Sequence, residues 1–233
     1  SNLEKNLDII EKYFDRKDKK NKIAAIIIET IQGGGGDRHI CKDFLNGLAR
    51  ILKKNKILFI DDEVQTGFGV TGKLWSFQKK YYNFTPDLLA FGKKSQISGV
   101  CINKNLEDID TVINRPGRYP PTWNGDIIDY VRCRYIIKAY KDDKLIINAE
   151  KLGKYIVKSL RSFKKFKNVR GKGFLIAFDF ENTKLRDKFY NEAFRKKLMV
   201  QPMQDKTIRI RPNMALKLKE ADMALNIIDS IKI

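Results

Sequence analysis

Two uninterrupted apolar segments, each ending in a polar or glycine-rich loop, constrain the fold of this chain most strongly. Residues 24–28 (AAIII) lead through Glu29 into four consecutive glycines, and residues 57–60 (ILFI) lead into the acidic residues 61–63. Continuous apolar runs of this length are typical of strands buried on both faces of a parallel sheet. The amphipathic pattern of residues 41–54 predicts a helix between them. The order strand, loop, helix, strand therefore predicts an α/β fold.

The remainder of the chain alternates helical and strand patterns without an internal repeat or a low-complexity linker. Short strands with polar turns follow residue 140, which is typical of a smaller α+β unit. We therefore expect two domains, 1–140 and 141–233. The spacing of apolar residues predicts helices over 3–14, 127–140, 149–164, 185–197 and 219–231, and strands over 88–91, 97–102, 173–180, 199–201 and 207–210.

The basic composition raises the question of nucleic-acid binding. The chain has 47 Lys and Arg against 28 Asp and Glu, a net charge of +19. Basic side chains clustered on one surface would bind phosphates, but most lysines here alternate with acids. Only residues 159–174 carry several cations without an acid. We interpret that stretch as a helix end running into a strand, so nucleic acid is not an expected partner.

Other classes of protein are disfavoured by simple features of the sequence. No apolar run approaches the roughly 20 residues of a membrane-spanning helix, and the first residues lack a signal-peptide pattern. A cytoplasmic location is therefore the expectation. Three scattered cysteines argue against a disulfide framework or a zinc cluster, and the single histidine, His39, excludes a multi-histidine metal site.

Acid–base chemistry must therefore depend on other residues, and a candidate set lies at the predicted strand ends. Ligands of α/β sheets bind outside the carboxyl ends of the strands, where Glu29, Asp62 and Lys93 would converge. A carboxylate can hold a pyridine nitrogen protonated, while a lysine amine forms a Schiff base and moves a proton. An ordinary surface turn is the alternative interpretation.

Several motifs then resemble one enzyme family, the class III (ω-amino acid) pyridoxal-phosphate aminotransferases. Residues 59–69 (FIDDEVQTGFG), continued by 71–75 (TGKLW), are similar to the cofactor motif of the family, and 87–94 (DLLAFGKK) is similar to its Schiff-base lysine segment. The glycine loop with Asp37, the pair Thr122–Trp123 and the run 208–212 (IRIRP) resemble further family segments. The resemblance implies the fold-type I architecture of pyridoxal-phosphate (PLP) transferases. Residues 1–140 would be part of the large parallel-sheet, PLP-binding domain, and residues 141–233 the C-terminal small α+β domain.

The resemblance also implies a role for each matching residue. Asp62 would pair with the pyridine nitrogen, Val64 would pack under the ring and Gln65 would bond the phenolic oxygen. Lys93 would be the catalytic Schiff-base lysine, with Lys94 a neighbouring or surface charge. Thr122 would bind the cofactor phosphate of a partner subunit, which implies a homodimer.

Two departures from the family pattern concern the substrate and the length. Arg209 would bind a substrate carboxylate, but Gly34 stands where the family commonly has a glutamate that pairs with this arginine. We therefore expect Arg209 to lack a local partner and the enzyme to distinguish ω- from α-amino donors poorly. The phosphate-cradle segment of the family has no counterpart here, so the chain resembles the C-terminal part of such an enzyme.

The function implied is transfer of the terminal amino group of L-lysine, or a similar ω-amino acid, to 2-oxoglutarate. Residues 91–96 (FGKKSQ) and 129–132 (DYVR) favour the L-lysine 6-aminotransferase subgroup. The first alternative is a 4-aminobutyrate aminotransferase, which would use the same lysine. The second is an inactive remnant that serves as a basic binding or interaction domain.

Overall fold

The computed structural model describes residues 2–14, 23–78, 82–106 and 125–233. The chain divides into two compact units. Unit 1 comprises residues 1–30, 40–65 and 76–137, and unit 2 comprises residues 31–39, 66–75 and 138–233. Two short segments of the N-terminal half, residues 31–39 and 66–75, thus belong to the same unit as the C-terminal half. The domains expected from the sequence, 1–140 and 141–233, stay a prediction.

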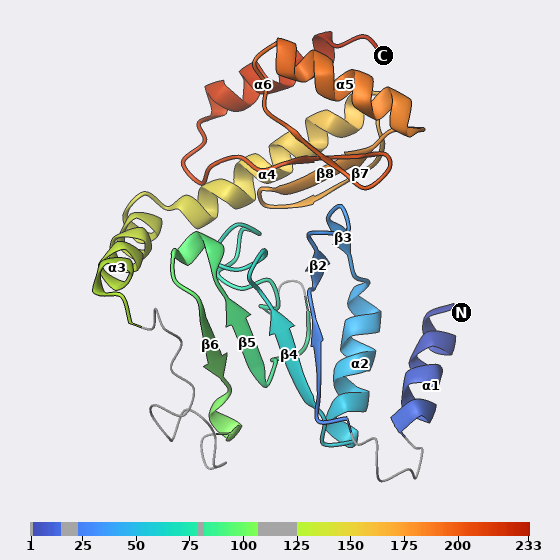
Figure 1. The fold of residues 1–233 in the computed structure, drawn as a ribbon, viewed down its shortest axis with the longest axis vertical. Helices are drawn as coiled ribbons and strands as arrows, with labels where there is room; N and C mark the ends of the chain where they lie inside the picture. The colour runs from blue at the N-terminus through green and yellow to red at the C-terminus, as the bar shows by residue number, and fades with distance from the viewer. Residues whose placement is uncertain (1, 15–22, 79–81, 107–124) are drawn as a thin grey trace. The chain divides into compact units, whose positions relative to one another are not determined.

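Unit 1 contains a four-stranded sheet in the order β1-β4-β5-β6 (Figure 1). Strands β1 and β5 each pair in parallel with the central strand β4, and β6 is antiparallel to β5. The strands are β1 (Ala25–Ile28), β4 (Leu58–Asp62), β5 (Leu88–Phe91) and β6 (Gly99–Ile102). Ile27 of β1 is 62% exposed, so the prediction that this strand is buried on both faces was wrong for the face that carries Ile27.

Helices α1 (Asn2–Phe14) and α2 (Lys42–Lys54) belong to the same unit. Leu45, Leu48 and Leu52 of α2 are buried in one cluster with Phe59 of β4. Burying such apolar side chains is the main stabilising contribution in a core of this kind. A Cβ on Gly47 would lie 2.4 Å from Leu7 Cδ1, so a larger residue there would require the Leu7 side chain to move. Two short 3₁₀ turns, η2 (Lys93–Ser95) and η3 (Lys104–Leu106), follow β5 and β6.

Unit 2 is built on an antiparallel sheet in the order β7-β8-β10-β9. Its strands are β7 (Lys167–Lys172), β8 (Leu175–Asp179), β9 (Gln201–Met203) and β10 (Thr207–Ile210). Helices α4 (Leu145–Ser162), α5 (Thr183–Arg195) and α6 (Leu218–Ser230) cover one face of it (Figure 1). Phe166, Phe178, Phe180 and Phe189 pack together there at ring distances of 4.2–5.8 Å. These aromatic contacts form the centre of the core.

The other face of this sheet carries polar side chains, and a small hairpin belongs to the same unit. The hairpin consists of β2 (Ile31–Gln32) and β3 (Arg38–His39), with the glycines between its strands. Arg170 of β7 donates to the carbonyls of Gly36 and Asp37, at 2.5 and 3.0 Å. The glycine loop is therefore held by the sheet through its backbone. The long helix α3 (Ile127–Asp142) contains the boundary between the two units.

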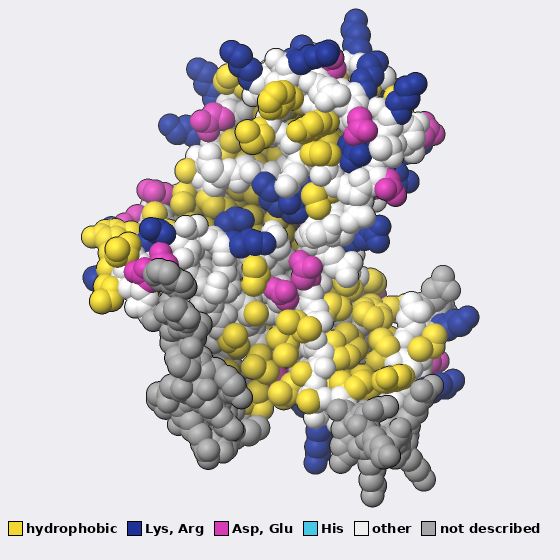
Figure 2. Space-filling view, viewed as in Figure 1, with side chains coloured by type: hydrophobic (Ala, Val, Ile, Leu, Met, Phe, Trp, Pro, Cys, Tyr) yellow, Lys and Arg dark blue, Asp and Glu magenta, His cyan; other side chains and the backbone are white. Residues whose placement is uncertain are grey.

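None of the helices in the described part of the chain is long and apolar enough to span a bilayer. On the face drawn in Figure 2, the Lys and Arg side chains are interspersed with Asp and Glu over the C-terminal helices. The same described residues contain no group of three or more His, Cys, Asp or Glu positioned to hold a metal ion.

Candidate functional site

The carboxyl ends of β4 and β5 bring together the residues predicted to bind the cofactor. Asp62 is paired in register with Ala90, and the next amide, Glu63 N–H, donates to the Ala90 carbonyl at 2.8 Å. The segments that follow β4 and β5 therefore leave the sheet next to each other. A Cβ on Gly92 would lie 3.8 Å from Val64 Cγ1, so Val64 of the loop after β4 lies close to the residue that precedes Lys93.

Three consecutive acidic residues at the end of β4 have different environments. Asp62 is half-buried, and its Oδ1 accepts a hydrogen bond of 3.1 Å from Val64 N–H. Glu63 is buried and accepts from the backbone N–H and the hydroxyl of Ser76, at 2.5 and 2.9 Å. Asp61 is fully buried. Of the three, Asp62 is the acid whose side chain is accessible at the strand end.

The protonation of Asp61 differs from that of an ordinary aspartate. Burial, and then the neighbouring Glu63 carboxyl, raise the pKa of Asp61, because both disfavour a second negative charge in a place with little solvent. Asp61 is therefore a neutral acid at neutral pH. This difference supports Asp62 as the carboxylate available to a cationic ligand.

Lys93 stands where β5 turns sharply into η2. Its φ of 53° lies in the left-handed region, which costs a lysine about 1 kcal/mol relative to an ordinary conformation. The amide of Gln96 and its side-chain Nε2 both donate to the Lys93 carbonyl, at 3.0 and 3.1 Å. The side chain of Lys93 is exposed, whereas that of Lys94 is half-buried. Strained backbone of this kind is concentrated at functional sites.

The remaining predicted cofactor residues are Gln65 and Thr122. Gln65 is half-buried and follows Val64 directly in the loop after β4. Thr122 lies outside the residues that the structure describes, as does Trp123, so its assignment stays a prediction. Trp75 packs edge-on against Phe68 at 5.4 Å between ring centres.

In unit 2, Arg209 is on β10 directly across from Gln201 on β9. Its Nε and Nη2 both donate to Gln201 Oε1, at 3.1 and 2.5 Å, and its Nη1 donates to the Gly33 carbonyl at 2.9 Å. The expectation that Arg209 lacks a local partner was therefore wrong. Gly34 is exposed, a Cβ there would meet nothing within 4 Å, and its carbonyl accepts from Gln204 Nε2.

The missed partner has a physical explanation in the β9–β10 hairpin. Strand β10 was predicted at its observed position, whereas β9 was predicted at residues 199–201 and lies at residues 201–203. A short turn between antiparallel strands fixes which residues oppose each other. Gln201 and Arg209 form such a directly opposed pair. The pairing register of this hairpin is therefore the signal that indicates the contact between Gln201 and Arg209.

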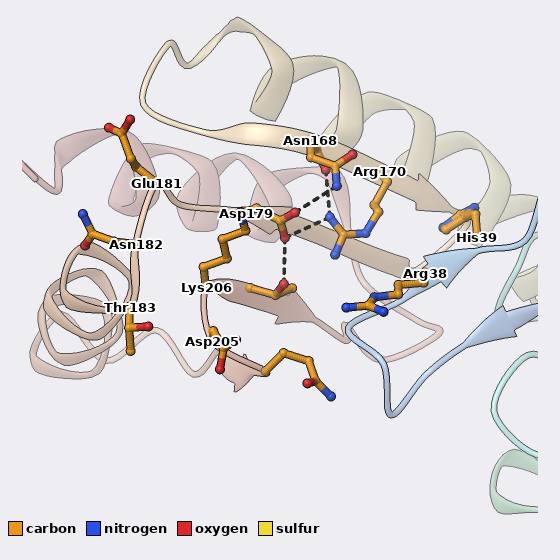
Figure 3. Close-up of a pocket in the computed structure, with 12 residues that line it drawn as sticks. Arg38, His39, Asn168, Arg170, Asp179, Glu181, Asn182, Thr183, Asp205 and Lys206 are labelled. Carbon is orange, nitrogen blue, oxygen red and sulfur yellow. Dashed lines mark hydrogen bonds and ion pairs between the residues drawn. The ribbon is translucent and has the colours of Figure 1, made fainter. Parts of the chain in front are cut away.

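Two buried carboxylates beneath the glycine loop were not predicted as site residues. Asp179 accepts from Arg170 Nη1 at 3.0 Å, from Thr207 Oγ1 at 2.7 Å and from Asn168 Nδ2 at 2.9 Å (Figure 3). Asp37 is fully buried and forms an ion pair with Arg211. Together, Arg170, Arg211, Asp37 and Asp179 form what we call the arginine layer of unit 2.

His39 lies beside this layer. Burial lowers the pKa of His39 to about 4, and the charges of Lys172, Arg170 and Arg211 act in the same direction. The imidazole is therefore neutral at physiological pH. His39 is on strand β3, and the expectation that acid–base chemistry depends on other residues stays a prediction.

An open groove of about 770 Å³ runs along the edge of the same unit (Figure 3). It is lined by both signs of charge, including Arg38, Lys206, Asp205 and Glu181. A mixed lining of this kind selects no single class of ligand, and the groove contains none of the residues predicted to bind the cofactor.

Comparisons with known proteins point to a single family. The family described as "Aminotransferase class-III" matches residues 1–231. An L-lysine-epsilon aminotransferase of Mycobacterium tuberculosis is 34% identical over 213 residues, which are 89% of this chain and 47% of that protein. A 4-aminobutyrate aminotransferase of Mycosarcoma maydis is 35% identical over 213 residues, covering 88% and 41%.

Solved structures give the same result. The lysine aminotransferase of M. tuberculosis in its internal aldimine form matches with a TM-score of 0.89 and 32% identity, over 97% of this chain and 52% of that one. An ornithine aminotransferase of Plasmodium yoelii matches with a TM-score of 0.82 and 31% identity, covering 97% of this chain and 60% of the other. The chain spans about half the length of the curated relatives it matches.

Proposed function

We propose that this chain, which belongs to the class III aminotransferase family, carries part of the active site of an enzyme that transfers the terminal amino group of L-lysine to 2-oxoglutarate. Its fold is the α/β architecture of the fold-type I PLP transferases, and the family depends on PLP. The observation that carries the proposal is the placement of Asp62 and Lys93 after two neighbouring parallel strands.

The residues at this edge suit the chemistry of PLP. When bound, the cofactor supplies an electron sink for the bond that breaks next to the amino group. The Asp62 carboxylate is the group that would keep its pyridine nitrogen protonated. Val64 would pack against the ring, Gln65 would donate to its phenolic oxygen, and the exposed Lys93 amine would attach it covalently.

Lys93 would have a second role as the base that accepts the proton from the substrate carbon and later returns it. An amine with access to the substrate carbon can accept a proton there and return it later. A turn fixed by Gln96 limits where the Lys93 backbone can lie. Positioning a proton-transfer group in this way typically contributes about 10²- to 10⁴-fold to a rate.

Arg209 would bind a carboxylate of the substrate, since guanidinium and carboxylate form paired, charge-assisted hydrogen bonds. A homodimer in which Thr122 binds the phosphate of the partner's cofactor, and a cytoplasmic location, are further parts of this proposal. The similarity of this chain to relatives named lysine aminotransferase supports L-lysine as the amino donor.

The decisive test is chemical trapping of the cofactor. The intact protein is loaded with PLP, reduced with borohydride, digested and mapped by mass spectrometry. We expect a pyridoxyl group on Lys93. A label on Lys94 with Lys93 unmodified would contradict the assignment, and absence of any label would favour the alternative that the chain is an inactive binding domain.

A second candidate donor is 4-aminobutyrate, because a relative with that name is as similar to this chain as the lysine enzyme is. The two candidates are separated by kcat/KM for L-lysine and for 4-aminobutyrate with 2-oxoglutarate as the acceptor. A higher value for 4-aminobutyrate would overturn the lysine assignment while leaving the aminotransferase proposal in place.

A further inference from the structure

The contact between Arg209 and Gln201 uses the edge of the guanidinium that suits a carboxylate. An arginine carries five N–H donors, and the Nε–Nη2 edge presents two of them in parallel. Both of these donors bond to the single oxygen Oε1 of Gln201. The third described bond, from Nη1, goes to the Gly33 carbonyl. A carboxylate approaching the Nε–Nη2 edge would have to displace the glutamine.

Gln201 leaves the positive charge of Arg209 uncompensated, since an amide is neutral. Among the described charges that act on Arg209, Arg211 disfavours the cation and Asp37 favours it. Asp37 is itself ion-paired with Arg211. Arg209 is therefore a cation capped by a neutral acceptor, and a substrate carboxylate would gain a charge interaction that Gln201 cannot supply.

The glycine loop contributes only backbone to this arrangement. Gly33 offers its carbonyl to Arg209, and Gly34 has open space where a side chain would be. The acceptor that occupies the guanidinium edge thus comes from the neighbouring strand β9 and not from the loop. Direct cross-strand pairing fixes its position relative to Arg209.

We propose that Gln201 is a specificity-determining residue that acts as an uncharged, displaceable cap on Arg209. Its amide oxygen occupies the Nε–Nη2 edge when no carboxylate is present, and it yields this edge to a carboxylate of the dicarboxylate acceptor. The proposal rests on the function proposed for Arg209 above. A glutamate at the same place would compete far more strongly, because ion-paired hydrogen bonds are stronger than those to a neutral oxygen.

Two substitutions at this position should have opposite effects. In Gln201→Glu, a charged cap should weaken dicarboxylate binding by roughly 10-fold or more, as expected when a hydrogen bond to a neutral group becomes one between charged groups. In Gln201→Met, a side chain of similar length without an acceptor should strengthen binding by about 3-fold, because competition for the edge is removed.

The measurement is the Kd of glutarate, an unreactive dicarboxylate, determined by calorimetry on the intact protein with PLP. The kinetic counterpart is kcat/KM for 2-oxoglutarate in its half-reaction, where we expect the change in KM and not in kcat. Met199→Glu is the charge control, since Met199 is 86% exposed and two residues from Gln201. It should change the Kd by less than about 2-fold, in line with weak coupling between exposed charges.

Three outcomes would overturn the cap. Weaker binding in both Gln201→Glu and Gln201→Met would show that the glutamine only supports the arginine. An equal change in the Kd of glutarate in Met199→Glu would show that any added negative charge nearby weakens binding. A wild-type protein that does not bind glutarate would show that Arg209 does not bind a dicarboxylate. Failure of the proposed function looks different, because it appears as absence of borohydride trapping at Lys93, whatever the Gln201 variants do.

Discussion

At the end of β4 in unit 1, acidic side chains are held by backbone N–H groups and hydroxyls, whereas in unit 2 buried carboxylates are held by arginines. Asp62 bonds to an amide two residues away, and Glu63 to groups of Ser76. Asp37 and Asp179 bond instead to Arg211 and Arg170. The first arrangement keeps an accessible carboxylate at a strand end, and the second cancels charge within the fold.

This difference separates the edge proposed to bind the cofactor from a layer whose charges are paired within the fold. Substitutions at the β4–β5 edge should change catalysis and cofactor binding more than folding, because Asp62 and Lys93 are only partly buried or exposed. Substitutions in the arginine layer should mainly change folding, because removing one member of a buried pair leaves the other charge without compensation. The predictions below test that division.

The largest effect is expected for Lys93→Ala. Loss of both the covalent attachment and the proton-transfer group should lower kcat by at least about 10³-fold, while Tm changes by no more than a few degrees because the side chain is exposed. Lys94→Ala is the matched control and should retain most activity. A collapse of Tm in Lys93→Ala would contradict the division between the two regions.

Asp62→Asn should come next in size. Removing the charge that pairs with a pyridinium should weaken cofactor retention by about 3–5 kcal/mol, the usual loss when one partner of a buried ion pair is deleted. Asp61→Asn should leave retention nearly unchanged, because the raised pKa of Asp61 already keeps that side chain neutral. Equilibrium dialysis of PLP measures both, and equal losses would mean that the wrong carboxylate was assigned.

For the arginine layer we expect Arg170→Met to lower the free energy of unfolding by about 3 kcal/mol. The substitution leaves Asp179 without its cation and the carbonyls of Gly36 and Asp37 without a donor. Arg195→Met removes an ion pair with Glu192 in which the Arg195 side chain is 74% exposed. It should lower the free energy of unfolding by less than about 1 kcal/mol. Urea unfolding at neutral pH compares them, and similar losses would argue against a structural role for the layer.

The fourth prediction concerns the dependence of stability on pH through His39. The pKa of His39 is about 4 in the fold, against 6.5 for an unperturbed histidine, so the unfolded chain binds an additional proton between these values. Stability contributed by neutral His39 is present above pH 6.5 and is lost as pH falls toward 4, by up to about 1.4 kcal/mol per pH unit. In His39→Gln this part of the loss of stability at low pH should be absent. Unfolding curves at about pH 7.5, 5.5 and 4.5, on either side of the ordinary histidine pKa, measure it, and identical slopes for both proteins would refute the buried environment.

The same contrast explains what could be predicted from the sequence. The edge with Asp62 and Lys93 was predictable because local patterns identify strands, and parallel strands align their carboxyl ends. The helices follow from short-range spacing as well, whereas the cofactor motif comes from its resemblance to the family. The arginine layer was not predictable in this way, since Arg170 reaches Asp37 across 133 positions of the sequence and Arg211 reaches it across 174. No periodicity encodes such pairs.

Intermediate cases lie between these extremes. Strand β7 was foreseen only as a helix running into a strand, because its sequence (KNVRGK) lacks an apolar alternation. The contact between Gln201 and Arg209 was not predicted, because the first strand of the hairpin was predicted at residues 199–201 and lies at residues 201–203, so the pairing register was not defined. The exposure of Ile27 on β1 was not predicted, because a continuous apolar run does not show which face of the strand is left uncovered.

Lys165 shows that lysines of this chain are not all interchangeable. Its ammonium donates to the carbonyls of Ile228, Asp229 and Ile231, each at 2.8–2.9 Å. These three carbonyls converge at the end of α6, and a compact group with three divergent donors can satisfy all of them at once. A planar guanidinium has no such geometry. An exchange of lysine for arginine is harmless at most surface positions. At position 165 it would leave carbonyls at the end of α6 without their donor.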